Sequence, residues 1–174
     1  KELWFTTPAR ICILWTREVL TEENRIFLAR LEPLRTTESF TICHGSIPDP
    51  DYYITSPYEA SISFRVLPTR IGFFGHTHIA EYYRWNREHS VLPEQVPCTG
   101  GCRIELEERF QFLINPGAVG QPRDGNSQAS FALWDSESGW VEIRRVPYNV
   151  KAAQDAILAA GLPEAMALRL SLGV

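Results

Sequence analysis

The stretch from Ile71 to His78 constrains this chain more than any other part of its sequence. It reads Ile-Gly-Phe-Phe-Gly-His-Thr-His, a short apolar run that ends in a glycine and is followed by two histidines one residue apart. The apolar run predicts a buried strand, and Gly75 marks the turn out of the sheet. In layered α/β proteins the carboxyl ends of strands carry ligands and chemistry. We therefore expect His76 and His78 at a functional edge of a sheet.

The spacing of these two histidines leaves their use open. In extended backbone their side chains would point to opposite sides, so each could serve one of two neighbouring metal ions. If the backbone curls, both could serve one ion. Two surface histidines that bind nothing are an equally good interpretation of the spacing alone.

A second stretch, Phe40 to Ser46, has the same sequence pattern. Its β-favouring run leads directly into His44-Gly45, and the following Ile47-Pro48-Asp49-Pro50 forces a loop. Two strands with the same ending predict one shared edge. Together they favour metal ligands over structural histidines at His44, His76 and His78.

The turn sequence Asn115-Pro116-Gly117 is expected to end a third strand and to hold a loop against the same edge. An Asn side chain can bond to nearby backbone, Pro fixes φ, and Gly permits a turn closed to other residues. Such a turn can support metal ligands from outside. Arg123 and Asp124 could pair with each other, fix this loop, or present a guanidinium to a phosphate, and we prefer the structural role.

In this order, these motifs resemble those of the calcineurin-like metallophosphoesterases. The stretches concerned are His44-Gly45-Ser46, Gly75 to His78, and Asn115 to Gly125. The sequence is most similar to small bacterial phosphoesterases of the diadenosine tetraphosphatase-related or predicted phosphodiesterase type, from about Pro8 to the C-terminus. The resemblance implies an α/β fold, a four-layer αββα sandwich with two divalent metal ions at the carboxyl ends of strands.

The same resemblance assigns roles to residues. His44 and His76 would ligate one ion and His78 the other, while Asn115 and Arg123 would support the site or the substrate. The implied reaction is hydrolysis of a phosphomonoester or phosphodiester by in-line attack of a metal-bound hydroxide at the dinuclear site. Manganese is the first expectation for the metal, with iron, zinc and nickel as alternatives.

Three motifs of that family are missing. The sequence contains no Asp-x-His, no Gly-Asp and no Asn-His, and the last of these would carry the general acid, so no catalytic residue is assigned in this chain. We expect residues 1–174 to be the C-terminal half or more of a single metallophosphoesterase domain. Two alternatives stay open: a catalytically incomplete binding or scaffold module, and a mononuclear metal protein that uses the three histidines alone.

Charge and hydrophobicity narrow the partners. Seventeen basic and twenty-one acidic residues give a net charge of −4, which does not support binding to long nucleic acids. No apolar run approaches the roughly 20 residues that span a bilayer, and the first residues do not resemble a signal peptide. We expect a cytoplasmic protein that acts on a small phosphoester or nucleotide, away from membranes, and leave a homo-oligomer open.

Periodicity and turn residues predict the remaining elements. We expect helices over 8–20, from Thr21 to before Pro33, over 150–160 and from Pro163, with the first two covering a face of the sheet. Strands are expected over 79–85, over 104–106 paired with 109–114, and as a hairpin of 130–135 with 140–146. Residues 58–67 are expected to be weakly helical or irregular, and residues 86–101, with the non-ligand His89, are expected to be an exposed excursion or a hairpin tip.

Two further groups of residues have competing interpretations. Cys98 and Cys102 are separated by three residues, and we favour a plain loop over a structural zinc site and over a local disulfide. The tyrosines of the loop after His44 could stack on a nucleobase, but half-buried packing is preferred; these are Tyr52, Tyr53 and Tyr58.

Overall fold

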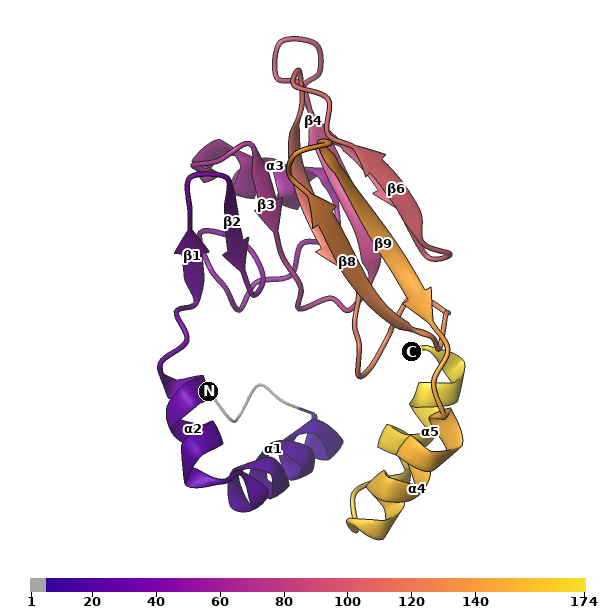
Figure 1. The fold of residues 1–174 in the computed structure, drawn as a ribbon. Helices are drawn as coiled ribbons and strands as arrows, with labels where there is room; N and C mark the ends of the chain where they lie inside the picture. Colours follow the sequence, from indigo (N-terminus) through magenta and orange to yellow (C-terminus); the bar gives the residue numbers. More distant parts are fainter. Residues whose placement is uncertain (1–5) are drawn as a thin grey trace. The chain divides into compact units, whose positions relative to one another are not determined.

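The computed structural model describes residues 6–174 (Figure 1). These form two compact units, which are described separately. The larger comprises Pro33–Tyr148 with Gly173–Val174, and the smaller comprises the described residues up to Glu32 with Asn149–Leu172. No helix within residues 6–174 is long and apolar enough to cross a membrane.

A six-stranded sheet forms the centre of the larger unit. Its strand order is β1-β2-β3-β7-β4-β5, in which β2, β3 and β7 are parallel and the other neighbours antiparallel. The carboxyl ends of β2, β3 and β7 therefore meet at one edge, as the sequence predicted for the strands that end near His44 and His76. The strands are β1 (Leu34–Thr36), β2 (Phe40–Cys43), β3 (Ile71–Phe73), β4 (Ala80–Trp85), β5 (Glu94–Pro97) and β7 (Gln111–Pro116).

A second, three-stranded sheet packs face to face on the first. It has the order β6-β9-β8 and is antiparallel throughout, with β6 at Cys102–Glu105, β8 at Ala129–Asp135 and β9 at Trp140–Val146. Figure 1 shows β8 and β9 in front of β4. Buried side chains of both sheets form one apolar cluster between them, and Phe40 of β2 meets Trp134 of β8 edge to face at 5.4 Å. The predicted hairpin of β8 and β9 is confirmed.

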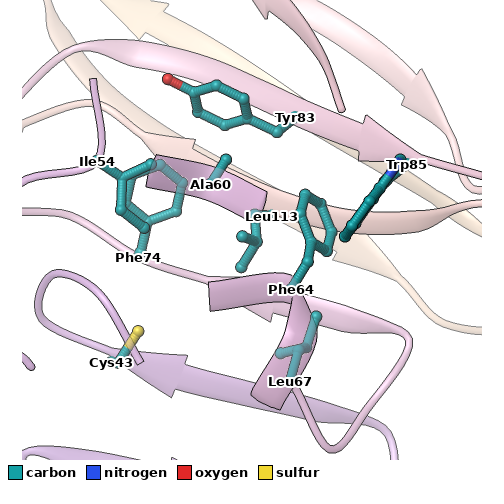
Figure 2. Close-up of a cluster of buried hydrophobic side chains, with 9 residues drawn as sticks. All are labelled: Cys43, Ile54, Ala60, Phe64, Leu67, Phe74, Tyr83, Trp85 and Leu113. Carbon is teal, nitrogen blue, oxygen red and sulfur yellow. The ribbon is translucent and has the colours of Figure 1, made fainter. Parts of the chain in front are cut away.

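Helix α3 (Pro57–Val66) covers the opposite face of the large sheet. Ser56 caps the helix by accepting a hydrogen bond from the Glu59 amide, and Pro57 occupies its first turn, so a region expected to be only weakly helical forms ten helical residues. Phe64 lies against Leu113 and Trp85 in the resulting cluster (Figure 2). The unit thus has an α-β-β order of layers, the one expected for this part of an αββα sandwich.

The smaller unit is helical. Its helices are α1 (Thr7–Val19), α2 (Glu22–Ala29), α4 (Val150–Ala159) and α5 (Glu164–Leu172). The predicted cap of the second helix is confirmed, because the Thr21 side chain accepts a hydrogen bond from the Asn24 amide at 3.2 Å. The Gln154 side chain donates to the Ala167 carbonyl and joins α4 to α5. That α1 and α2 cover a face of the sheet stays a prediction.

The predicted pairing of 104–106 with 109–114 is wrong. Strand β6 lies beside β9 in the small sheet, whereas β7 lies between β3 and β4 in the large sheet. Burial explains the difference: β7 has four consecutive buried residues and suits the middle of a sheet covered on both faces, whereas β6 buries only Ile104. The region expected to be an excursion or a hairpin tip contains strand β5, which pairs with β4 and so forms a hairpin.

The expectation of a plain loop between Cys98 and Cys102 is also wrong, because a disulfide joins them. This segment connects β5 in the large sheet to β6 in the small sheet. The chain turns back there: the Gly101 amide donates to the Cys98 carbonyl at 2.8 Å, and Gly101 has a φ of 88°. The turn leaves the two Cα atoms 5.5 Å apart, within the range that a disulfide requires.

Replacing Phe64 by Ala tests the importance of the cluster beneath α3. The Phe64 side chain is fully buried, so its loss is expected to lower the free energy of unfolding by about 3–5 kcal/mol in urea titrations. Val66→Ala is the matched control in the same helix; Val66 is 53% exposed, and its loss should cost less than about 0.5 kcal/mol. Equal losses for the two variants would contradict this description of the core.

Alkylation under denaturing conditions without reductant tests the disulfide. Intact mass should show two labelled cysteines of four, since only Cys12 and Cys43 are free. Replacing Cys98 and Cys102 together by Ser should lower the free energy of unfolding by about 2 kcal/mol, because the released loop is short. Labelling of all four cysteines would show that the bond does not form.

Candidate metal centre

Three histidines lie at the edge where the parallel strands end. His44 follows β2 directly, and His76 and His78 follow β3 after the turn at Gly75. The ring centroids of His44 and His76 are 4.5 Å apart. His44 is exposed, whereas His76 and His78 are half-buried. The prediction that both strands end at one shared edge is confirmed.

The backbone at His76 and His78 is not extended. Their φ angles are 68° and 62°, in the left-handed region that residues other than glycine rarely adopt. Of the two geometries left open by the spacing, the chain therefore adopts the curled one. Such conformations persist where the surrounding structure fixes them. Here the Gly75 amide donates to the His44 carbonyl at 2.8 Å and so joins the two histidine segments.

The Asn115 side chain supports the segment that carries His76 through hydrogen bonds. The side chain is fully buried at the end of β7, where Nδ2 donates to the Gly75 carbonyl at 3.2 Å and to Thr77 Oγ1 at 2.8 Å. Its Oδ1 accepts from the Gly117 amide at 2.9 Å. The Asn-Pro-Gly turn thus holds the residues on both sides of His76.

His76 and His78 each have one ring nitrogen hydrogen-bonded to a backbone carbonyl. His76 Nε2 lies 3.1 Å from the Asp51 oxygen, and His78 Nδ1 lies 2.8 Å from the Gln121 oxygen. Because a carbonyl only accepts, the bonded nitrogen carries the hydrogen, and the neutral ring has its lone pair on the other nitrogen. His76 therefore offers Nδ1 and His78 offers Nε2. Metal-ligating histidines usually have this arrangement.

The surroundings favour neutral rings. Burial lowers the pKa of His76, and the nearby His44 adds to this effect, while the hydrogen bond to Asp51 opposes it. Burial also lowers the pKa of His78, against the opposing effect of its bond to Gln121. Both rings therefore stay neutral to lower pH than an ordinary histidine, and only a neutral imidazole binds a metal.

The loop after His44 folds back over its own turn. The Ser46 amide donates to the Tyr52 carbonyl at 3.0 Å, and a Cβ atom on Gly45 would lie 2.5 Å from that same oxygen. Only glycine fits after His44 for this reason. The loop places the Tyr53 ring parallel to the His76 ring, with centroids 4.0 Å apart and planes 8° apart.

The expected half-buried packing of the tyrosines describes Tyr52 and Tyr53, but not Tyr58. Tyr52, Tyr53 and Tyr58 are 51%, 44% and 65% exposed. Tyr53 has one ring face on His76, and the Tyr52 hydroxyl lies 3.4 Å from Glu59. The proline-rich sequence indicated a loop, but it did not indicate contact with His76.

Arg123 and Asp124 do not pair with each other as one interpretation had it. The Arg123 guanidinium donates twice to the Gln121 side chain, and its backbone amide donates to the His78 carbonyl at 3.1 Å. Asp124 instead pairs with Arg145 of β9. His89 lies exposed in the turn between β4 and β5, at the other end of β4 from His78.

These residues fit a metal as part of a ligand set. Two neutral rings offer a free nitrogen each beside a third imidazole, which suits borderline divalent ions. Within residues 6–174, however, no three His, Cys, Asp or Glu side chains are grouped so that they could hold an ion. The Asp-x-His and Gly-Asp motifs, which would supply a bridging carboxylate, are absent from the sequence.

Comparison with known proteins places the chain in a family, although no family model matches its sequence. The uncharacterized protein MJ0912 of Methanocaldococcus jannaschii is 34% identical over 177 residues, which cover 98% of this chain and 68% of that protein. The crystal structure of a metallophosphoesterase from Sphaerobacter thermophilus matches with a TM-score of 0.84 at 34% identity, over 92% of this chain and 67% of that one.

The hypothetical protein PH1004 from Pyrococcus horikoshii OT3 shares the fold, with a TM-score of 0.73 at 18% identity over 99% of this chain and 63% of that one. The fold and the 34% identity to the Sphaerobacter protein agree with the motifs around His44, His76 and Asn115. The chain belongs to the metallophosphoesterases.

Proposed function

We propose that this chain supplies part of the active site of a metal-dependent phosphoesterase that hydrolyses a phosphomonoester or a phosphodiester. The observation that carries the proposal is the pair of oriented histidines. His76 and His78 are each bonded through one ring nitrogen to a backbone carbonyl, so the other nitrogen is free at the edge beside His44. Membership of the metallophosphoesterases supports this reading.

The proposed ligand roles are those that the family resemblance implies, and the contact between the His44 and His76 rings supports one of them. His44 and His76, whose rings are neighbours, would hold one divalent ion, and His78 would hold the second. Manganese is our first choice, with iron, zinc or nickel as alternatives that accept similar ligands. When bound, two such ions would clamp phosphate oxygens and supply a water of lowered pKa for in-line attack.

The three histidines are not a complete ligand set for two divalent ions. Three neutral imidazoles leave the charge of two divalent ions uncompensated, and no carboxylate bridges them. We propose that a preceding segment of the same protein provides the missing carboxylates and the general acid. The lengths of the relatives support this, because this chain spans only 68% and 67% of the first two. The 174-residue chain alone should bind metal weakly and hydrolyse little.

The substrate is proposed to be a small phosphoester or nucleotide. A net charge of −4 does not favour long nucleic acids, whose binding depends on basic surfaces. A cytoplasmic location is proposed with it; the Cys98–Cys102 disulfide would then be an exception to the reduced state that cysteines usually have there.

Hydrolysis of p-nitrophenyl phosphate and bis(p-nitrophenyl) phosphate with Mn²⁺ tests the proposal in the longer protein, meaning these 174 residues with the preceding segment. His76→Ala should lower kcat/KM by about 100-fold, because it removes a ligand of one ion. His89→Ala is the matched control and should change kcat/KM by less than about twofold. Activity of the verified 174-residue chain that survives His76→Ala would refute the proposal.

Asn115→Ala tests the support beneath the histidines. The change leaves the Gly75 carbonyl and the Thr77 hydroxyl without their partner, so the free energy of unfolding should fall by about 1–3 kcal/mol. Mn²⁺ affinity, measured by calorimetry, should fall by about 10- to 100-fold. Asn86→Ala in the distant turn after β4 is the control. Equal metal affinity in Asn115→Ala and wild type would show that Asn115 does not position the histidines.

A further inference from the structure

Asp124 and Arg145 form an ion pair that is shielded from solvent. Each side chain is only 3% exposed, whereas most other ion pairs among the described residues lie at the surface. Two buried charges are costly to keep, and a pair of apolar residues is often at least as stable. Stability alone therefore does not explain why this pair is here.

The pair also leaves polar atoms unused. Asp124 Oδ1 and Arg145 Nε are buried and have no hydrogen-bond partner among residues 6–174. A pair formed only for stability would use both carboxylate oxygens in a fork with the guanidinium. Here Asp124 Oδ2 takes both contacts instead, one from Arg145 and one from the Ala80 amide at 3.0 Å.

These contacts lead to His78. Residues 121–124 contact residues 78–80 in three ways: the Gln121 carbonyl holds the His78 ring, the Arg123 amide holds the His78 carbonyl, and Asp124 holds the Ala80 amide. Ala80 begins β4 two residues after His78, whose φ is 62°. The carboxylate of Asp124 thus fixes the backbone directly beyond the left-handed residue.

Arg145 connects this clamp to the other sheet. It lies on β9 of the small sheet, and its Nη1 also donates to the Gln128 carbonyl at 3.3 Å. The ion pair therefore crosses from the small sheet to the start of β4 in the large sheet. Arg145 fixes the orientation of the Asp124 carboxylate. Its loss would therefore also release the position of segment 121–124.

We propose that Arg145, acting through Asp124, is a positioning residue that sets the tautomer and ring orientation of His78. The inference deepens the proposed function, since it rests on His78 as a metal ligand, but the geometry of the ring can be tested without metal. Its distinguishing consequence is local: loss of the pair should disturb His78 and leave His44 and His76, which have other supports, unchanged.

Imidazole ¹⁵N NMR of the metal-free longer protein provides the test. Wild-type His78 should show a single neutral tautomer with the hydrogen on Nδ1, as its bond to Gln121 requires. Arg145→Lys keeps the charge but loses the guanidinium that bonds both Asp124 and the Gln128 carbonyl, and should give a mixture of tautomers at His78 only. Arg144→Lys, the same change at the neighbouring residue in an exposed pair with Glu142, should leave all histidines as in wild type.

Metal titration adds a second readout. In Arg145→Lys the affinity for one of two Mn²⁺ ions should fall by about 10- to 100-fold, and the other should be unchanged. If that variant does not fold, Asp124→Asn combined with Arg145→Gln removes both charges together and leaves none unpaired. A lower melting temperature with an unchanged His78 tautomer would overturn the inference. Metal binding that is unchanged in His78→Ala would instead overturn the proposed ligand role.

Discussion

The left-handed backbone at His76 and His78 is the constraint on which the site depends. Each such residue costs about 1–3 kcal/mol and persists only if its neighbours fix it. The neighbours come from three segments: the His44 carbonyl after β2 accepts from Gly75, Asn115 near the end of β7 bonds Gly75 and Thr77, and residues 121–124 bond His78 and Ala80. Because the backbone is curled, the rings of His76 and His78 both lie at this edge. In an extended segment the two side chains would point to opposite faces.

The layers of the larger unit make that edge rigid. The parallel strands β2, β3 and β7 lie between the cluster beneath α3 and the cluster shared with the small sheet, so their ends cannot move independently. The small sheet covers the large one and also helps to fix the site, because Arg145 of β9 pairs with the Asp124 carboxylate, which accepts from the Ala80 amide at the start of β4. Scaffold and site are thus connected by a few named hydrogen bonds.

The sequence predicted what local chemistry determines. Apolar runs that end in His-Gly or Gly-His indicated the strands and their shared edge, and Asn-Pro-Gly indicated the supporting turn. Backbone partners were not predictable, because the carbonyls of Asp51 and Gln121 have no side-chain signature. Long-range choices were also missed: β6 and β7 separate into different sheets by burial, and Asp124 pairs with a residue 21 positions away.

Anomalous diffraction from crystals of the longer protein grown with Mn²⁺ would show directly whether His76 and His78 bind metal. Two ions are expected at the edge of the sheet, one about 2 Å from Nδ1 of His76 and the other about 2 Å from Nε2 of His78. The Asp51 and Gln121 carbonyls should still hold the opposite nitrogens. Ions bound through those opposite nitrogens, or no ion at this edge, would contradict the proposed ligand roles.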